Sequence, residues 1–467
     1  MQQVYYGLRD ALLSREALFA HAREIALEAT TPGNRSDFMR LGLDEKRLTT
    51  AYAHLSAAQD TEDIAAQWLL DHFHVLEQVC KELEGAWQPL RKLPRIAQGP
   101  FAGLPRVYRV AADMTGHHEG QLDEQLIVGY LRSYQEESIL TMDELWALRT
   151  ALQTALIKLC SLLAVECLQV RACRKSAEEN ALRLYSMKPE EARDALRKLP
   201  LREPEYVERL CSRMREWGGS ALAAEELARM DTDELRMAQA AHRQQLRRRL
   251  LLGNAITSIR LLGEMDWENV FRAISKVDEI LEDDPVFRLM DTSSRCYYRD
   301  CVTRLARRAG VSEPAVARGA QALAGEDHEG LSPGERARQS HVGWYLCSGG
   351  RPRLLHALRP EIGKGRKSAF GSYLVAVSAL TALFLLLAVW AGGGEPGDWW
   401  GLALALLPGL VCAWSFSQFI IQRLLTRLPV RRLPRLELKE GIPDAYRTLV
   451  AVPVLAGRAE DAASLAG

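Results

Sequence analysis

Two long uncharged segments late in the chain constrain its fold more than any other feature. Residues 368–394 contain no charged side chain, and residues 399–422 form a second such segment after a short loop. A helix rises about 1.5 Å per residue, so about 20 apolar residues cross a hydrocarbon core roughly 30 Å thick. Both segments exceed that length and predict a hairpin of two transmembrane helices. The alternative is a pair of buried core helices, which two adjacent segments of this length do not favour.

The charges around the two segments predict their orientation. Basic residues lie outside the hairpin on both sides, whereas the loop between the segments carries only Glu395 and Asp398. Basic flanks stay in the cytoplasm, so we expect both termini to be cytoplasmic, with tryptophans at the interfaces. The expected membrane-flanking residues are Lys364, Arg366, Lys367, Trp390, Trp399, Trp400, Arg423, Arg427, Arg431, Arg432 and Arg435.

The composition argues against several classes of protein. Sixty basic residues balance 60 acidic residues, so no overall field favours nucleic acid. The nine cysteines are scattered without a paired framework, which is typical of reduced thiols in the cytosol. The N-terminus has no cationic segment before an apolar core and is not a signal peptide. Membrane insertion is therefore expected to depend on the late hairpin.

The chain before the hairpin predicts an all-α fold. Apolar residues recur at helical spacing through residues 1–185 and again through residues 186–365. The proline-rich and charged stretch 186–206 either marks the boundary between two helical regions or only separates helices. Thr141 and Glu144 match a capping box, and the apolar sequence after them predicts a long buried helix.

The chain after the hairpin changes in character. Residues 423–447 are basic and interrupted by prolines, and they predict a connector along the anionic inner surface of the membrane. Residues 448–455 are a β-branched apolar run that is typical of a buried parallel strand. We expect residues 448–467 to be the start of a further domain that is cut short.

Several motifs resemble metal sites but have simpler explanations. His72 and His74 are two residues apart on a predicted helix and point in different directions. The run at 117–119, His-His-Glu, lies at a predicted helix end. The Asp-Thr-Asp run at 231–233 resembles a metal–diphosphate motif of glycosyltransferases, but it directly precedes a helix that its acids suit as a helix start. We expect no metal, cofactor or catalytic residue in these runs.

Two charged runs are likewise interpreted as surfaces. The cluster Arg243, Arg247, Arg248 and Arg249 has no interleaved aromatic residues, so a solvated or interdomain face is favoured over nucleic-acid binding. The acidic run 282–284 precedes Pro285 and predicts a solvated helix end. The chain contains no phosphate-binding loop, dinucleotide-binding motif or nucleophile elbow.

Several segments, taken in order along nearly the whole chain, resemble one family. They include WLLDHFHVLEQ, the run RLMDTSSRCYYRD and HVGWYLCSGGRPRL. With them the chain is similar to the bacterial cyclic β-1,2-glucan synthases. The segments that carry the resemblance are Trp68–Gln78, Leu93–Ala111, Gly120–Gln135, Leu140–Ile157, Gly253–Phe271, Val277–Glu313, His341–Leu354 and Leu433–Leu455.

The resemblance implies a function and also marks two departures. It implies a UDP-glucose-dependent transferase domain, with a divalent metal, that begins near residue 448, and further glycan-processing domains beyond. Ser293, Ser294 and Cys296 depart from the family pattern around its Thr-Arg. The family's donor-binding acids and catalytic base have no counterparts here, so no catalytic residue is carried over.

The leading interpretation is therefore the N-terminal cytosolic and membrane-anchoring part of a cyclic β-1,2-glucan synthase of the bacterial inner membrane. Its expected partners are the lipid bilayer and the transferase and glycan-processing domains of the same polypeptide, not nucleic acid. The alternative is a stand-alone, membrane-anchored helical scaffold that binds a separate partner. A helical nucleic-acid binder has only the arginine cluster in its favour.

Overall fold

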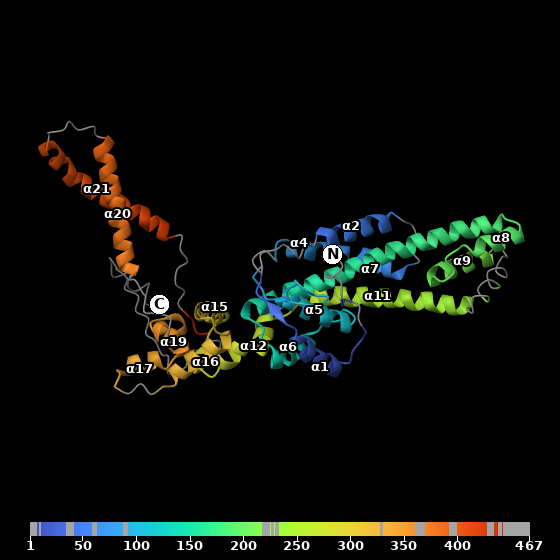
Figure 1. Cartoon of the computed structure of the whole chain (residues 1–467), viewed down its shortest axis with the longest axis horizontal. Coiled ribbons are helices and arrows are strands. Elements are labelled where there is room, and N and C mark those ends of the chain that lie inside the picture. Colours follow the sequence, from blue (N-terminus) through green and yellow to red (C-terminus); the bar gives the residue numbers. More distant parts are fainter. Residues whose placement is uncertain are drawn as a thin grey trace, which may run out of the picture. The chain divides into compact units, whose positions relative to one another are not determined.

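The protein forms two compact units, Met1–Lys276 and Val277–Gly467, and both are built from helices. Figure 1 shows these helices in a computed structural model. The predicted all-α fold is confirmed. In the described part of the chain, β1 (Thr30–Thr31) pairs antiparallel with β2 (Arg95–Ile96) in a two-stranded sheet. The structure describes residues 7–8, 11–33, 42–57, 63–86, 92–216, 225, 228, 233–326, 330–359, 369–391, 399–426, 434–437 and 441.

The first unit is organised around α7 (Met142–Tyr185), which Figure 1 shows as one long helix. Its apolar residues recur on several faces, and helices from both ends of the unit pack against it. Further helices of the unit are α1 (Arg15–Ala26), α2 (Gly42–Ser56), α3 (Ile64–Asp71), α4 (Phe73–Leu83), α5 (Arg106–His117), α6 (Glu124–Glu137), α8 (Pro189–Leu196), α9 (Pro204–Glu216), α11 (Glu234–Glu264) and α12 (Trp267–Ile274).

Helix α7 begins as the sequence predicts. The Thr141 hydroxyl accepts a hydrogen bond from the Glu144 amide, and the Glu144 carboxylate accepts one from the Thr141 amide. Among the residues whose side chains the structure describes, α7 is the one helix long and apolar enough to span a membrane by length and composition, but 78% of its apolar window is buried in the protein. The part of α20 (Ala369–Ala391) described in this way, Tyr373–Leu387, is a shorter apolar helix. A buried Lys158–Asp44 ion pair, 2.7 Å long, joins it to α2. Helix α7 is therefore a core helix.

The helix predicted around His72 differs from the structure in one respect. It is broken into α3 and α4 at His72, whose Nδ1 lies 3.0 Å from the carbonyl oxygen of Trp68. A side chain that binds the carbonyl four residues earlier competes with the helical ladder. Ile64, the first residue of α3, is 41% exposed.

The stretch 186–206 lies within the first unit, where it follows α7 and contains α8 and the start of α9. Pro189 and Pro204 each begin a helix, where the missing amide proton of proline leaves no helical bond unmade. Helix α9 then packs on both α7 and α11.

The second unit contains a cluster of shorter helices centred on α15 (Thr292–Ala309) and α16 (Glu313–Ala324), which pack on each other and on α18 and α19. Two serines of this unit occupy N-cap positions. Ser332 forms a capping box with Glu335, whereas Ser312 holds the N-cap position without a side-chain bond. The other helices of the cluster are α13 (Lys276–Leu281), α14 (Pro285–Arg288), α17 (Pro333–Gln339), α18 (Val342–Cys347) and α19 (Arg351–Leu358).

The two uncharged segments form α20 (Ala369–Ala391) and α21 (Trp399–Leu425), which pack against each other. Val377 and Ser417 are fully buried, and the rings of Phe384 and Phe416 meet edge to face at 5.3 Å. Large apolar side chains on the other faces are exposed; they include Leu374, Val375, Leu383, Leu386, Leu387, Leu410, Val411, Phe416, Phe419, Leu424 and Leu425.

The predicted membrane-flanking residues are only partly described. Arg423 lies in the last turn of α21, Trp390 in α20, and Trp399 and Trp400 at the start of α21. Arg435 lies in the described segment 434–437. Lys364, Arg366, Lys367, Arg427, Arg431 and Arg432 lie outside the described residues, as does the predicted strand at 448–455.

Candidate functional site

A buried ion pair holds the second unit together. The side chains of Arg299 on α15 and of Asp278 on α13 are almost completely buried, with exposures of 1% and 0% respectively. Arg299 Nε lies 3.1 Å from Asp278 Oδ1, and Nη2 lies 2.5 Å from Oδ2. This paired geometry gives each buried charge a partner that offsets its lost hydration.

A second buried network links α14, α15 and α18 through Asp284. Its Oδ1 accepts from the amides of Val286 and Phe287 at the start of α14. Its Oδ2 accepts from the Val342 amide at 2.9 Å and from His341 Nδ1 at 2.8 Å. His341 Nε2 lies 2.9 Å from the Tyr298 hydroxyl. The prediction that the acidic run 282–284 is a solvated face is therefore wrong for Asp284, because its carboxylate caps one helix and binds the start of another.

The Asp284 network predicts a pH dependence of stability. Burial raises the pKa of Asp284, but hydrogen bonds from His341 and the Val342 amide outweigh it, so this pKa lies below its ordinary value. A carboxyl group with a lowered folded pKa contributes stability above its unfolded pKa of about 3.9, and this contribution is lost as pH falls through the folded value. Thermal unfolding of Asp284→Asn should show a lower midpoint than the native chain at pH 7. The gap should narrow in acid, and a gap that stays constant with pH would contradict this assignment.

Two cysteines on neighbouring helices lie in contact. The Cys301 and Cys347 sulfurs are 3.2 Å apart, and Nη2 atoms of Arg304 and Arg351 lie 3.2 and 3.6 Å from Cys301 Sγ. The hydrogen bond from the Cys347 thiol, together with these guanidinium groups, lowers the pKa of Cys301 to about 6 despite its burial. Cationic surroundings of this kind favour a thiolate.

We expect diamide to convert this pair into a disulfide. The two thiols lose two protons and two electrons to the reagent, and the sulfurs need to move together by about 1 Å, given an S–S bond of about 2.05 Å. Mass spectrometry of non-reduced peptides should recover the joined Cys301 and Cys347 peptides, and dithiothreitol should separate them. Cys347→Ser is the control that removes the link. Recovery of both native thiols after exhaustive oxidation would contradict the prediction.

The segment after the hairpin is docked on the same unit. The Arg435 amide donates to the Ser294 hydroxyl at 2.7 Å, and the Asp291 amide donates to the Arg435 carbonyl at 3.2 Å. The Glu437 amide donates to the Leu289 carbonyl at 2.7 Å, which completes an antiparallel bridge between Met290 and Leu436. The described part of the basic connector is thus bound to the start of α15, at one of the positions where the sequence departs from the resembling family.

In the first unit, three metal-ligating side chains converge. His21 of α1 and Asp113 and His117 of α5 place their ligand atoms within 4.8 Å of one another. Asp113 is 1% exposed and also binds Arg109 Nη1 at 2.8 Å and the Tyr130 hydroxyl at 2.8 Å. Burial raises the pKa of Asp113, but the hydrogen bond from His21 and the charge of Arg109 outweigh it and keep this pKa low. Of this group, only His117 lies in a motif that is visible in the sequence, because His21 and Asp113 are 92 residues apart.

Other predicted motif residues lie elsewhere. His118 Nδ1 lies 2.8 Å from the Gln121 carbonyl and outside the convergent group. Asp233 caps α11 by accepting from the Arg236 amide, whereas Asp231 lies outside the described residues. In the arginine cluster, Arg243, Arg247 and Arg249 are exposed. Arg248 is buried with Nη1 2.5 Å from Glu205 Oε1, so the solvated face is wrong for this residue.

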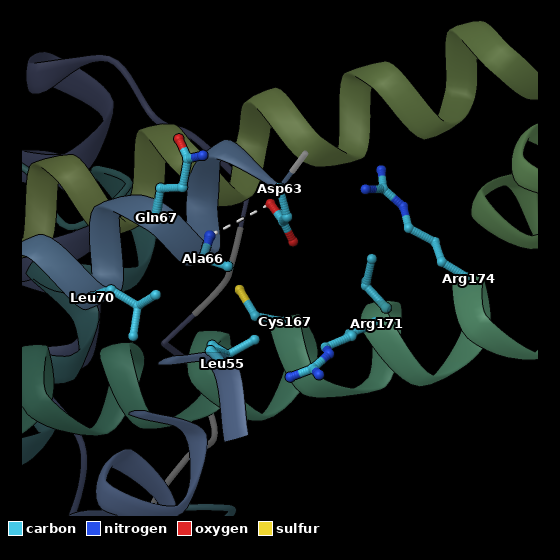
Figure 2. Close-up of a pocket in the computed structure, with 9 residues that line it drawn as sticks. Leu55, Asp63, Ala66, Gln67, Leu70, Cys167, Arg171 and Arg174 are labelled. Atoms are coloured by element: carbon cyan, nitrogen blue, oxygen red, sulfur yellow. Dashed lines mark hydrogen bonds between the residues drawn. The ribbon is translucent and has the colours of Figure 1, made fainter. Parts of the chain in front are cut away.

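A cavity in the first unit is too small for a sugar nucleotide. Figure 2 shows it between Asp63 at the start of α3 and the α7 residues Cys167, Arg171 and Arg174. Its volume is ≈ 30 Å³, close to the share of one liquid water molecule, whereas ligand pockets enclose about 300–1,000 Å³. The Asp63 carboxylate meets the Ala65 and Ala66 amides, so it serves as a helix cap. This cavity is a packing defect beside a cap.

Together these features define an all-α protein with an apolar helical hairpin and buried polar networks. No protein-family model matches the chain. It is 27% identical over 431 residues to the cyclic beta-(1,2)-glucan synthase NdvB of Rhizobium meliloti (strain 1021). The match covers 84% of this chain and 14% of that protein, so the chain spans a small part of its relative's length. The chain is related to the cyclic glucan synthases.

Proposed function

We propose that this chain is the N-terminal cytosolic and membrane-anchoring part of a glucan synthase that polymerises glucose from UDP-glucose into cyclic β-1,2-glucan. The observation that carries the proposal is the similarity to the Rhizobium meliloti synthase over 84% of the chain. Glucosyl transfer, with a divalent metal on the leaving diphosphate, belongs to a transferase domain beyond these residues. The role of this chain is to hold that domain at the inner face of the membrane.

The hairpin supports the anchoring role. Its outer faces expose large apolar side chains such as Val375 and Phe419, at 69% and 63% exposure, which water would disfavour and lipid would accept. Two polar groups of the hairpin are buried and bonded within their own helices, since the Thr381 and Ser417 hydroxyls donate to helix carbonyls. The basic residues around the hairpin favour the cytoplasmic side for both ends.

The docked connector supports the positioning role. The bridge between Met290 and Leu436 fixes the chain after the hairpin on the second unit, at a point 12 residues before the predicted strand at 448. A domain that starts there would be held close to the helical unit. The stand-alone scaffold remains the second candidate, since the same exposed hairpin and helical surfaces would serve it.

A chimera tests the function. The Rhizobium meliloti synthase, with the region that matches this chain replaced by this chain, is expressed in a strain that lacks the synthase. Membrane vesicles from that strain should convert UDP-[¹⁴C]glucose into cyclic glucan. Two controls use a truncated synthase that lacks the replaced region. In one it is expressed alone, and in the other it is expressed together with this chain as a separate, unlinked protein. Equal glucan from the chimera and from the truncated synthase would contradict the positioning role, and no glucan from a stably expressed chimera would favour the scaffold.

A further inference from the structure

The three convergent side chains of the first unit have the spacing of a metal site. Asp113 and His117 are four residues apart on α5, so both project from one face of that helix. His21 approaches from α1, which packs against α5. Two ligands from one helix and a third from its neighbour leave a further coordination position for water, as in open zinc sites.

The distances agree with coordination of a small ion. His21 Nδ1 lies 3.1 Å from Asp113 Oδ2, and His117 Nε2 lies 3.8 Å from Asp113 Oδ1. Zinc binds nitrogen and oxygen ligands at about 2.0–2.2 Å, which places two tetrahedral ligand atoms about 3.3–3.6 Å apart. The observed separations bracket that range, so small side-chain movements would complete the site.

The surrounding contacts orient the ligands. His117 Nδ1 lies 2.7 Å from the Ala11 carbonyl, so Nδ1 carries the proton and Nε2 is directed at Asp113. Histidine ligands usually donate their second nitrogen to such a carbonyl, and ligating carboxylates usually accept further hydrogen bonds. Arg109 and Tyr130 supply those bonds to Asp113.

The electrostatics and access also permit a cation. Arg109 places a positive charge near the site, but its Nε is paired with Glu28 Oε1 at 3.2 Å, and Asp113 carries a second negative charge. The Asp113 carboxylate is buried, whereas the His21 side chain is 29% exposed, so an ion can enter from the His21 side.

We propose that His21, Asp113 and His117 bind a divalent transition metal, with Zn²⁺ as the ion that two imidazoles and a carboxylate best fit. The ion fastens α1 to the end of α5. It also fixes the N-terminal segment, since the Ala11 carbonyl contacts His117 and the Leu13 amide donates to the His117 carbonyl at 3.0 Å. The role is structural and independent of glucosyl transfer.

Metal titration of the full chain in detergent micelles tests the proposal. Zn²⁺ competition against a chromophoric chelator gives the affinity, and Co²⁺ absorption reports the geometry. His21→Ala and His117→Ala should each weaken Zn²⁺ binding by more than about 100-fold, above the 10–100-fold typical of an outer contact. His118→Ala is the matched control, because its imidazole neighbours the site without joining it. Circular dichroism confirms that each variant is folded.

Two results would overturn the proposal. One is native chain that binds Zn²⁺ no more tightly than the His21→Ala variant. The other is an equal loss of affinity in His118→Ala, which would assign the ion to surface histidines. The Asp113→Asn variant distinguishes loss of metal binding from loss of the contact with Arg109. Its amide oxygen can still accept a hydrogen bond from Arg109, but the variant should lose the thermal stabilisation that Zn²⁺ gives the native chain.

Discussion

Replacing Arg299 by alanine is expected to lower the free energy of unfolding of the second unit by about 3–5 kcal/mol. The substitution leaves Asp278 at 0% exposure without the guanidinium that makes three close contacts with its carboxylate. A buried charge that loses its partner bears the full cost of its lost hydration. A loss of this size is comparable to the total stability of many domains.

The measurement is thermal unfolding followed by circular dichroism in the same detergent for every variant. Arg308→Ala is the matched control, because this exposed arginine lies on the same helix and should change stability by less than about 0.5 kcal/mol. The double variant Asp278→Leu with Arg299→Met should recover much of the loss, since it leaves no unpaired charge. An Arg299→Ala midpoint equal to that of Arg308→Ala would show that the pair does not hold α13 to α15.

Replacing Arg106 by alanine should destabilise the first unit by a similar amount, about 3–5 kcal/mol. Its Nε and Nη2 lie 2.8 and 2.6 Å from the two oxygens of Glu144, which is 0% exposed. Arg106 also donates from Nη1 to the Ser138 hydroxyl at 2.8 Å and from Nη2 to the Ile139 carbonyl at 3.1 Å. Glu144 also closes the capping box of α7, so the loss acts at the start of the central helix.

The same unfolding experiment measures this effect. Arg183→Ala is the control, because Arg183 is exposed in the last turn of the same α7. Arg106→Lys should lie between the native chain and Arg106→Ala, since an ammonium group keeps the charge but not the two parallel bonds to Glu144. A lysine variant as stable as the native chain would show that charge alone accounts for the effect.

Both pairs lie in segments that carry the resemblance to the glucan synthases. Arg106 lies in Leu93–Ala111 and Glu144 in Leu140–Ile157, whereas Asp278 and Arg299 both lie in Val277–Glu313. In this chain those segments contain buried arginines that each bind a carboxylate on another helix. His341, from the further segment His341–Leu354, meets Tyr298 of Val277–Glu313 at the Asp284 network. These resembling residues therefore contribute to the packing of the helical units.

Local features were predictable from the sequence, and long-range partnerships were not. The hairpin helices and the capping box at Thr141 depend on residues within a few positions of one another. The pairing of Lys158 with Asp44 spans 114 residues, and only the folded chain brings them together. The prediction of a solvated position is wrong for Asp284 because its partner, His341, is 57 residues away in the sequence. An acidic run before a proline is otherwise typical of a solvated helix end.

The most direct test of the account is the membrane topology of the hairpin. Single cysteines are placed at positions 392–398, between the two predicted spans, and at positions 360–368, before the first span, on a cysteine-free background. They are labelled in intact cells with a maleimide that does not cross the inner membrane. We predict that cysteines at 392–398 react from outside and that those at 360–368 react only after the membrane is opened, with the chain resisting carbonate extraction. Protection of both positions, or release of the chain by carbonate, would contradict a cytosolic helical module anchored by a transmembrane hairpin.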